Sequence, residues 1–188
     1  YNTVTARPAE AFSVAISGEG ADELPRDATN TIVRAIALAC TEANRQMPAL
    51  ALDCMHDVPT SRGLGSSSTA LVAGLLLGDA LCDGALGRDR VFALAAREEG
   101  HPDNVAPAVY GGMQVCAVNA QGAPVRVALP VREFPLVALF IPDFPMPTKE
   151  ARAVVPASLS RADAVFTLSR AALVVAALAA GDDSALDE

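Results

Sequence analysis

The feature that most constrains this chain is a glycine- and serine-rich loop, which lies between an alternating strand and an Ala/Leu-rich helix. Residues 50–58 alternate apolar and polar side chains, a pattern typical of a half-buried strand. The run after the loop predicts a helix that reaches about Cys82. The loop itself reads Pro59-Thr60-Ser61-Arg62-Gly63-Leu64-Gly65-Ser66-Ser67-Ser68-Thr69.

This loop has the properties of an anion site. Gly63 and Gly65 let a bulky anion approach the backbone, because no Cβ stands in the way. The amides of residues 66–69 would form the first turn of the helix, where free N–H groups and the helix dipole favour negative charge. A triphosphate fits there, and a serine hydroxyl in that turn can reach its magnesium ion. The alternative is an ordinary serine-capped helix after a flexible turn.

Two better-known phosphate motifs are excluded. A Walker A loop requires Gly-Lys-Ser/Thr, whereas the chain's single lysine is Lys149. A dinucleotide fingerprint requires glycine where Ser68 stands, together with a parallel sheet that the pattern does not indicate. The net charge of −8 argues against nucleic acid or an anionic membrane as a partner, because both need a positive surface.

The cysteines and the apolar stretches favour a cytoplasmic protein. Four cysteines lie far apart without a Cys-x-x-Cys pair, so reduced thiols are expected rather than a zinc site or a disulfide scaffold. The longest apolar stretches, residues 70–77 and 171–180, are shorter than a bilayer span.

The order of expected elements predicts an α+β fold. Strands come in hairpins and helices are not evenly interleaved with them, which disfavours a doubly wound sheet. The final helix, residues 160–180, is expected to be buried in the hydrophobic core. The apolar spacing from Ile32 to Met47 predicts the first helix, with Thr29 or Asn30 as its cap. The other expected elements are strands at 3–6, 12–17, 112–118, 124–129 and 136–141, and helices at 88–99 and 160–180.

Two further polar segments are candidate binding loops. Residues 98–104 read Glu-Glu-Gly-His-Pro-Asp-Asn directly after a helix, although Gly100 as a helix stop and Asn104 as a helix cap would explain them equally well. Residues 148–152 read Thr-Lys-Glu-Ala-Arg after a Pro-rich loop. An arginine there could grip a carboxylate, or the segment is a solvated helix start. His56 is interpreted as a packed or edge histidine of its strand.

Taken in order, these segments resemble the GHMP kinases and, within them, the homoserine kinases. Residues 59–69 are similar to the superfamily's second motif, Pro-x-x-x-Gly-Leu-Gly-Ser-Ser, which wraps the ATP phosphates. Residues 99–112, 147–152 and 160–166 are similar to homoserine kinases in particular. The superfamily's first and third motifs are absent, so the resemblance implies a chain trimmed at both ends.

The resemblance implies a two-domain fold. Residues 1–132 would form the ATP-binding domain, similar to ribosomal protein S5 domain 2. Residues 133–188 would begin a ferredoxin-like C-terminal domain that is incomplete. The implied localisation is cytoplasmic, and a homodimer is compatible with the family.

The resemblance also implies a phosphotransferase, which uses ATP and Mg²⁺ to phosphorylate the hydroxyl of L-homoserine, a step in threonine biosynthesis. Another GHMP kinase, of the mevalonate type, and a catalytically inactive nucleotide-binding fragment are the alternatives. Residues 59–69 would hold ATP, and the hydroxyl proton would pass to the phosphate itself. Ser67 and Glu99 would bind the magnesium ion, with Glu98 as the second choice for the carboxylate. His101 and Asp103 would bind the ammonium group of homoserine, and Arg152 would bind its carboxylate. Asn104 and Thr148 would lie near the reacting hydroxyl and the γ-phosphate.

Overall fold

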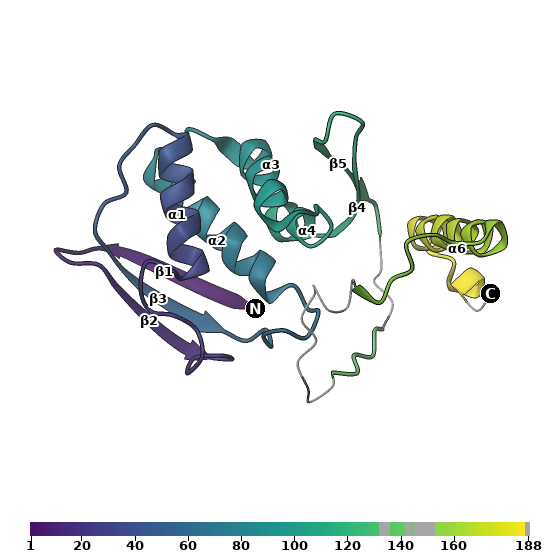
Figure 1. Cartoon of the computed structure of the whole chain (residues 1–188), viewed down its shortest axis with the longest axis horizontal. Coiled ribbons are helices and arrows are strands. Elements are labelled where there is room, and N and C mark those ends of the chain that lie inside the picture. The colour runs from purple at the N-terminus through teal and green to yellow at the C-terminus, as the bar shows by residue number, and fades with distance from the viewer. Residues whose placement is uncertain (132–135, 142–143, 145–152, 187–188) are drawn as a thin grey trace.

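The computed structural model describes residues 1–131, 136–141, 144 and 153–186 of the chain, and its N-terminal body is built on a three-stranded sheet (Figure 1). Strand β3 (Leu50–His56) lies in the centre. It pairs antiparallel with β1 (Asn2–Pro8) and parallel with β2 (Ser13–Gly18). The strands expected at residues 3–6, 12–17 and 50–58 are confirmed, and the alternation of residues 50–56 places every second side chain in the core.

The first two strands do not form the expected hairpin, because β3 lies between them. Parallel pairing of β2 with β3 requires a crossover connection, and the helix between these two strands supplies it. The sheet therefore holds one parallel pair that the sequence pattern did not indicate. The hairpin prediction is confirmed for β4 (Met113–Val118) and β5 (Pro124–Leu129), which pair antiparallel in a separate sheet.

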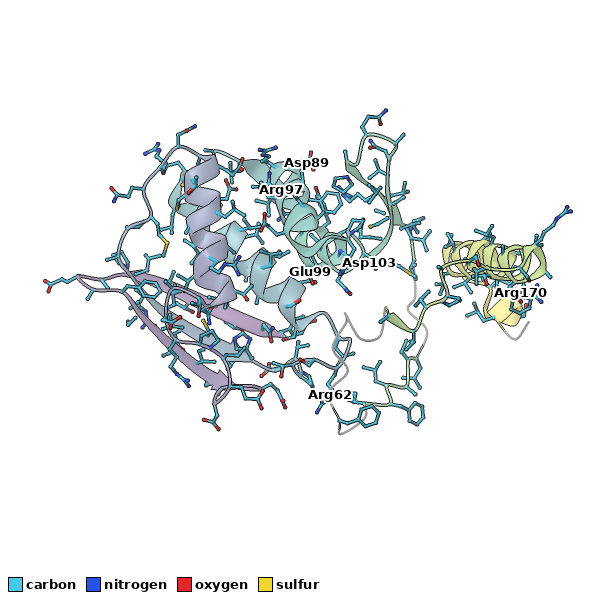
Figure 2. The ribbon with its side chains drawn as sticks, in the orientation of Figure 1. Arg62, Asp89, Arg97, Glu99, Asp103 and Arg170 are labelled. Carbon is cyan, nitrogen blue, oxygen red and sulfur yellow. The ribbon has the colours of Figure 1, made fainter. Side chains whose placement is uncertain are left out.

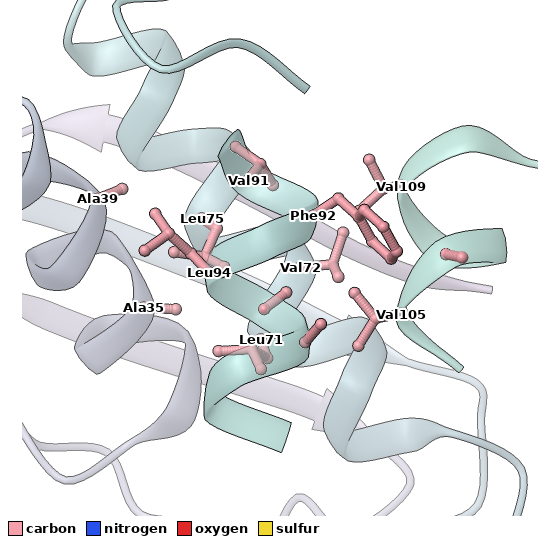
Figure 3. Packing of buried hydrophobic residues seen from close by; sticks show 13 residues of the cluster. Ala35, Ala39, Leu71, Val72, Leu75, Val91, Phe92, Leu94, Val105 and Val109 are labelled. Carbon is pink, nitrogen blue, oxygen red and sulfur yellow. The ribbon is translucent and has the colours of Figure 1, made fainter. Parts of the chain in front are cut away.

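Helices cover one face of the three-stranded sheet and form a second layer beyond it (Figure 1). Helix α1 (Thr31–Glu42) and α2 (Ser66–Leu81) pack together, while α3 (Gly87–Glu99) and α4 (Val105–Tyr110) pack against α2. One hydrophobic cluster joins β2, β3 and α1, and a second joins the helices (Figure 3). The α+β prediction is therefore confirmed for this body.

Helix α1 begins and ends for local reasons. The Asn30 side chain accepts a hydrogen bond from the Ile32 amide at 2.9 Å, which confirms the asparagine as the helix cap. The helix ends at Glu42, earlier than the apolar spacing up to Met47 predicted. Asn44 adopts a left-handed conformation with φ of 55°, which breaks the helical path before the spacing runs out.

The C-terminal part differs from the prediction in two ways. Helix α6 (Arg161–Ala180) forms where expected and is followed by the short helix η1 (Asp183–Leu186). Within α6, however, only Ala177 is buried, so the prediction of a core helix is wrong for the described residues. Residues 136–141 form no strand and are exposed, because no described strand lies beside them to pair with their backbone.

Helix α6 also bears on the membrane prediction. In the described part of the chain it is the helix that is long and apolar enough to cross a bilayer, by length and composition alone. The stretch 171–180 was expected to be shorter than a bilayer span, whereas the helix that contains it begins at Arg161 and includes the exposed Arg170 (Figure 2). Length and composition by themselves are weak evidence for a membrane span.

Candidate functional site

The candidate site is centred on the N-terminus of α2, where the glycine–serine loop becomes helical. Gly65 precedes the helix in a left-handed conformation, with φ of 74°, and no side chain caps the helix. The first intrahelical bond runs from the Thr69 amide to the Gly65 carbonyl at 2.9 Å. The amides of residues 66–68 precede that bond and have no acceptor within the helix. This turn therefore presents free N–H groups and the positive end of a helix dipole.

Glu99 lies directly against this turn. Its Oε1 atom accepts hydrogen bonds from the hydroxyls of Ser67 and Ser68, each at 2.8 Å. The carboxylate is the last residue of α3, and its side chain is only 17% exposed. The C-terminus of its own helix disfavours a negative charge, whereas the N-terminus of α2 favours one. Fold and electrostatics together therefore hold Glu99 on the serine turn.

The neighbouring glutamate is held differently. Glu98 lines a second cavity together with Ser67 and Glu99, but its carboxylate pairs with the Arg97 guanidinium at 3.5 Å rather than with the serine hydroxyls. The sequence left the choice between the two carboxylates open, and the structure brings Glu99, not Glu98, to the serines.

His101 and Asp103 form a pair beside Glu99. His101 Nδ1 lies 2.5 Å from Asp103 Oδ1, and its Nε2 lies 4.0 Å from Glu99 Oε1. Burial pushes the pKa of Asp103 upward, but hydrogen bonds from the Asn104 amide and from His101 outweigh it, so this pKa lies below its usual value. Asp103 remains 71% exposed, so its charge is available to a ligand. Figure 2 shows Glu99 and Asp103 between α3 and the start of α4.

Asn104 completes the group of side chains around the loop. A Cβ built on Gly65 would lie 3.4 Å from the Asn104 Oδ1 atom, so the amide sits against the turn that precedes α2. Asn104 makes no side-chain cap bond to α4, so its alternative role as a helix cap is not observed. The other two candidates, Thr148 and Arg152, lie outside the described residues.

A cavity of about 190 Å³ opens beside the loop, between the end of β3 and the starts of α1 and α2. Its apolar walls include Leu24, Pro25 and Ile32. Ser66 and Ser67 line its edge, so it is continuous with the first turn of α2. The remaining lining residues are Asn30, Thr31, His56, Thr60, Ser61 and Ala70.

Two residues near the site were not predicted from the sequence. Asn2 donates a hydrogen bond to the Thr69 hydroxyl at 2.8 Å and accepts two from the amides after β3, at 3.2 Å each, so it ties β1 to the loop. No local signal marks an asparagine in an edge strand. His56 lines the cavity, and its place three residues before Pro59 at the end of a strand was the available signal.

The arrangement brings amides that suit an anion close to oxygen atoms that suit a cation. Amides of α2 can hold phosphate oxygens, while one carboxylate and serine hydroxyls are ligands that Mg²⁺ accepts together with phosphate. Among the described residues no group of three or more His, Cys, Asp or Glu side chains is spaced for a metal ion. Glu99 and the serines therefore suit an ion that arrives with a phosphate ligand.

Comparison with known proteins agrees with this geometry. Residues 30–112 match the family model described as the GHMP kinases N terminal domain. This part of the chain is therefore similar to the N-terminal domain of the GHMP kinases. Among its curated relatives, homoserine kinases from Deinococcus radiodurans and Desulfitobacterium hafniense are 42% and 37% identical over 96% and 95% of this chain. The solved structure of homoserine kinase from Cytophaga hutchinsonii is 26% identical and superimposes with a TM-score of 0.75.

The matches extend over nearly all of this chain but over only part of each relative. The Cytophaga structure covers 98% of this chain, and this chain covers 60% of that structure. The chain likewise spans about 60% of the length of the two curated relatives. The GHMP kinase fold expected from the motifs is confirmed by these matches.

Proposed function

We propose that this protein transfers the γ-phosphoryl group of ATP to the hydroxyl of L-homoserine, with Mg²⁺ bound between the nucleotide and the protein. The single observation that carries the proposal is the contact of Glu99 with the hydroxyls of Ser67 and Ser68 at the uncapped start of α2. The identity of the curated relatives as homoserine kinases supports the choice of substrate.

The residues of the loop would act by position and charge. Phosphoryl transfer leaves a protein mainly to orient the reactants and to stabilise developing negative charge. The amides of residues 66–68 would hold the phosphates, with the whole loop, residues 59–69, shaping the ATP site. Bound Mg²⁺ would neutralise charge on the transferring group, held by Ser67 and Glu99.

The polar pair beside Glu99 would select the amino acid. A zwitterion such as homoserine needs an acceptor for its ammonium group, and Asp103 is an exposed carboxylate oriented by His101. Asn104 would lie near the reacting groups, since its amide sits against Gly65. Arg152 for the carboxylate and Thr148 near the γ-phosphate complete the proposal.

The wider proposal concerns the whole protein. Residues 1–132 would form the ATP-binding domain and residues 133–188 the beginning of a second domain, in a cytoplasmic enzyme of threonine biosynthesis. Its partner would be the small-molecule substrate L-homoserine, with no nucleic acid or membrane, and the proposal is compatible with a homodimer.

The test is a substrate panel with the complete protein. ADP formation is measured with ATP and Mg²⁺ in the presence of L-homoserine, mevalonate or galactose. The proposal expects turnover with homoserine and at least tenfold lower kcat/KM for the other two alcohols. Turnover with mevalonate alone would place the protein among other GHMP kinases. ATP binding without turnover of any alcohol would identify a nucleotide-binding protein that is not an enzyme.

A further inference from the structure

His56 is an unusual residue for the position that it occupies. It is the last residue of β3 and only 3% exposed. Among the buried side chains of the described residues, His56 alone has polar atoms without a hydrogen-bond partner, and this applies to both Nδ1 and Nε2. Buried polar groups in folded proteins are nearly always paired, so an unpaired imidazole calls for a partner that binds later.

The location of His56 suggests where that partner comes from. Its side chain lines the cavity of about 190 Å³ that runs to Ser66 and Ser67. Drug-sized ligands occupy sites of roughly 300–1,000 Å³, so this cavity suits one part of a nucleotide rather than all of it. The part that lies beyond the phosphates is the base. Leu24, Pro25 and Ile32 give the walls the apolar character that a flat heteroaromatic ring requires.

Asn30, the amide side chain that lines this cavity, already makes hydrogen bonds within the protein. Asn30 Nδ2 donates to the Pro25 carbonyl at 2.8 Å, and Asn30 Oδ1 accepts from the Ile32 amide at 2.9 Å. These bonds fix the start of α1 and the segment before it. Asn30 therefore serves the walls of the cavity, which leaves His56 as the ring with donor and acceptor capacity to spare.

We propose that His56 is a binding residue for the nucleobase, forming a hydrogen bond through one ring nitrogen to the base of ATP bound in this cavity. The inference rests on the proposed function and adds a residue to it. Both ring nitrogens are covered in this structure, so base binding would include a reorientation of the imidazole. Burial lowers the pKa of His56, so the ring is neutral and offers one donor and one acceptor.

The test compares ligands with and without a base. Dissociation constants are measured by calorimetry for ATP and for inorganic tripolyphosphate, with the complete protein and its His56→Phe variant. Phenylalanine keeps a planar ring and removes both nitrogens. The proposal expects ATP binding to weaken about tenfold and tripolyphosphate binding to change by less than twofold. His56→Asn, which restores a donor and an acceptor, is expected to recover part of the ATP affinity.

A spectroscopic measurement on the unmodified protein makes the test independent of variant folding. The chain has two histidines, so the ring nitrogens of His56 and His101 give a simple ¹⁵N-edited spectrum. The proposal expects the His56 signals to shift on addition of ADP and to stay in place with tripolyphosphate. Equal shifts with both ligands, or unchanged ATP affinity in folded His56→Phe protein, would overturn the role of His56 and leave the proposed function intact. Failure of the unmodified protein to bind either ligand would overturn both.

Discussion

Gly65 has to satisfy two conditions at once. Its φ of 74° lies in the left-handed region, which residues with a Cβ rarely adopt. A side chain there would also point at the Asn104 amide, 3.4 Å from its oxygen. Gly63 has a similar φ of 73°, but a Cβ on it would meet open space. Gly63 is therefore required for its backbone conformation alone, whereas Gly65 is required both for its conformation and for its close approach to Asn104.

Gly65→Val should abolish tight nucleotide binding. The added side chain crowds Asn104 and the path of the phosphates, so we expect ATP affinity to fall at least tenfold, about 1.4 kcal/mol. Gly84→Val is a matched control, since Gly84 has φ of 72° in a turn with open space around its Cβ. Both variants should lose similar stability in urea, and calorimetry should show the binding defect only at residue 65. Equal ATP affinity in both folded variants would contradict the phosphate site.

Glu99→Gln should separate binding from turnover. The amide keeps the shape of the side chain but loses the negative charge that a magnesium ligand requires. We expect kcat to fall at least about 100-fold, about 2.7 kcal/mol, with ATP still bound. Glu98→Gln is the adjacent control and should keep near-normal kcat, because Glu98 faces Arg97. The reverse pattern in steady-state kinetics would assign the ion to Glu98.

The burial of His56 should appear in the pH dependence of stability. Burial lowers the pKa of His56 below its usual value near 6.5, so the unfolded chain binds a proton more readily than the folded chain. The contribution of neutral His56 to the free energy of unfolding is therefore fully present above about pH 6.5. It decreases as the pH falls below that value, by at most about 1.4 kcal/mol per pH unit. The difference in unfolding free energy between unmodified protein and His56→Phe, measured in urea from pH 7.5 to 5.5, isolates this effect. A constant difference would show that His56 titrates normally.

At the scale of elements, α1 and α2 approach so closely that glycine is required between them. A Cβ on Gly74 would lie 2.5 Å from the Ile32 carbonyl oxygen, and one on Gly78 would lie 2.5 Å from the Ala39 Cβ. These distances are shorter than any normal packing contact, so the helices would have to separate. Because the first turns of both helices border the cavity beside the phosphate loop, this packing also sets the width of the site.

Gly74→Ala should therefore destabilise the protein, although alanine is the better helix former. In an exposed helix the substitution would add up to about 1 kcal/mol of stability. Here the overpacking against α1 should outweigh that gain, with a net loss of about 1–3 kcal/mol. Ala80→Gly on the exposed side of α2 is the control and should cost about 1 kcal/mol from propensity alone. Urea denaturation of the two variants checks the sign, and a stabilised Gly74→Ala protein would refute the close packing.

At the scale of the molecule, the core lies in the N-terminal body. Of the buried apolar residues that the structure describes, all but Ala177 fall between Val14 and Val109. Helix α6 and residues 136–141 instead display large apolar side chains to solvent, among them Leu136 and Phe140 at 102% and 93% exposure. Figure 1 shows α6 apart from the sheet and the first four helices. The folding free energy of the described chain therefore comes mainly from residues 1–131.

Residues 1–131 should consequently fold without the rest of the chain. We expect a protein that ends at residue 131 to unfold cooperatively in urea, with a midpoint close to that of the 188-residue chain, because both hydrophobic clusters remain complete. ATP affinity should be retained within about tenfold, since the loop and Glu99 lie in this part. Non-cooperative unfolding would show that the C-terminal part stabilises the N-terminal body. Loss of the helical circular dichroism signal at a urea concentration well below the midpoint of the 188-residue chain would show the same.

Much of the local structure follows from the sequence alone. The alternation of residues 50–56, the helical spacing after Asn30 and the glycine–serine loop each depend on neighbours within a few positions. Their backbone conformation is set by side-chain periodicity and by the conformations that glycine permits. Local pattern therefore predicts the anion site at the start of α2, the α+β class and the candidate residues 98–104.

The tertiary structure decided what depends on partners distant in the chain. The sheet order, with β3 between β1 and β2, depends on such long-range contacts, and so does the contact of Glu99 with Ser68, which lies 31 residues away. The imidazole of His56 is unpaired because the folded chain brings no partner to it. The apolar composition of α6 predicted burial, but burial needs a second surface, and within the described residues the main contacts of α6 are with the short helix η1 and with β5. Local pattern specifies which face of an element is apolar, whereas only the packed chain specifies what that face meets.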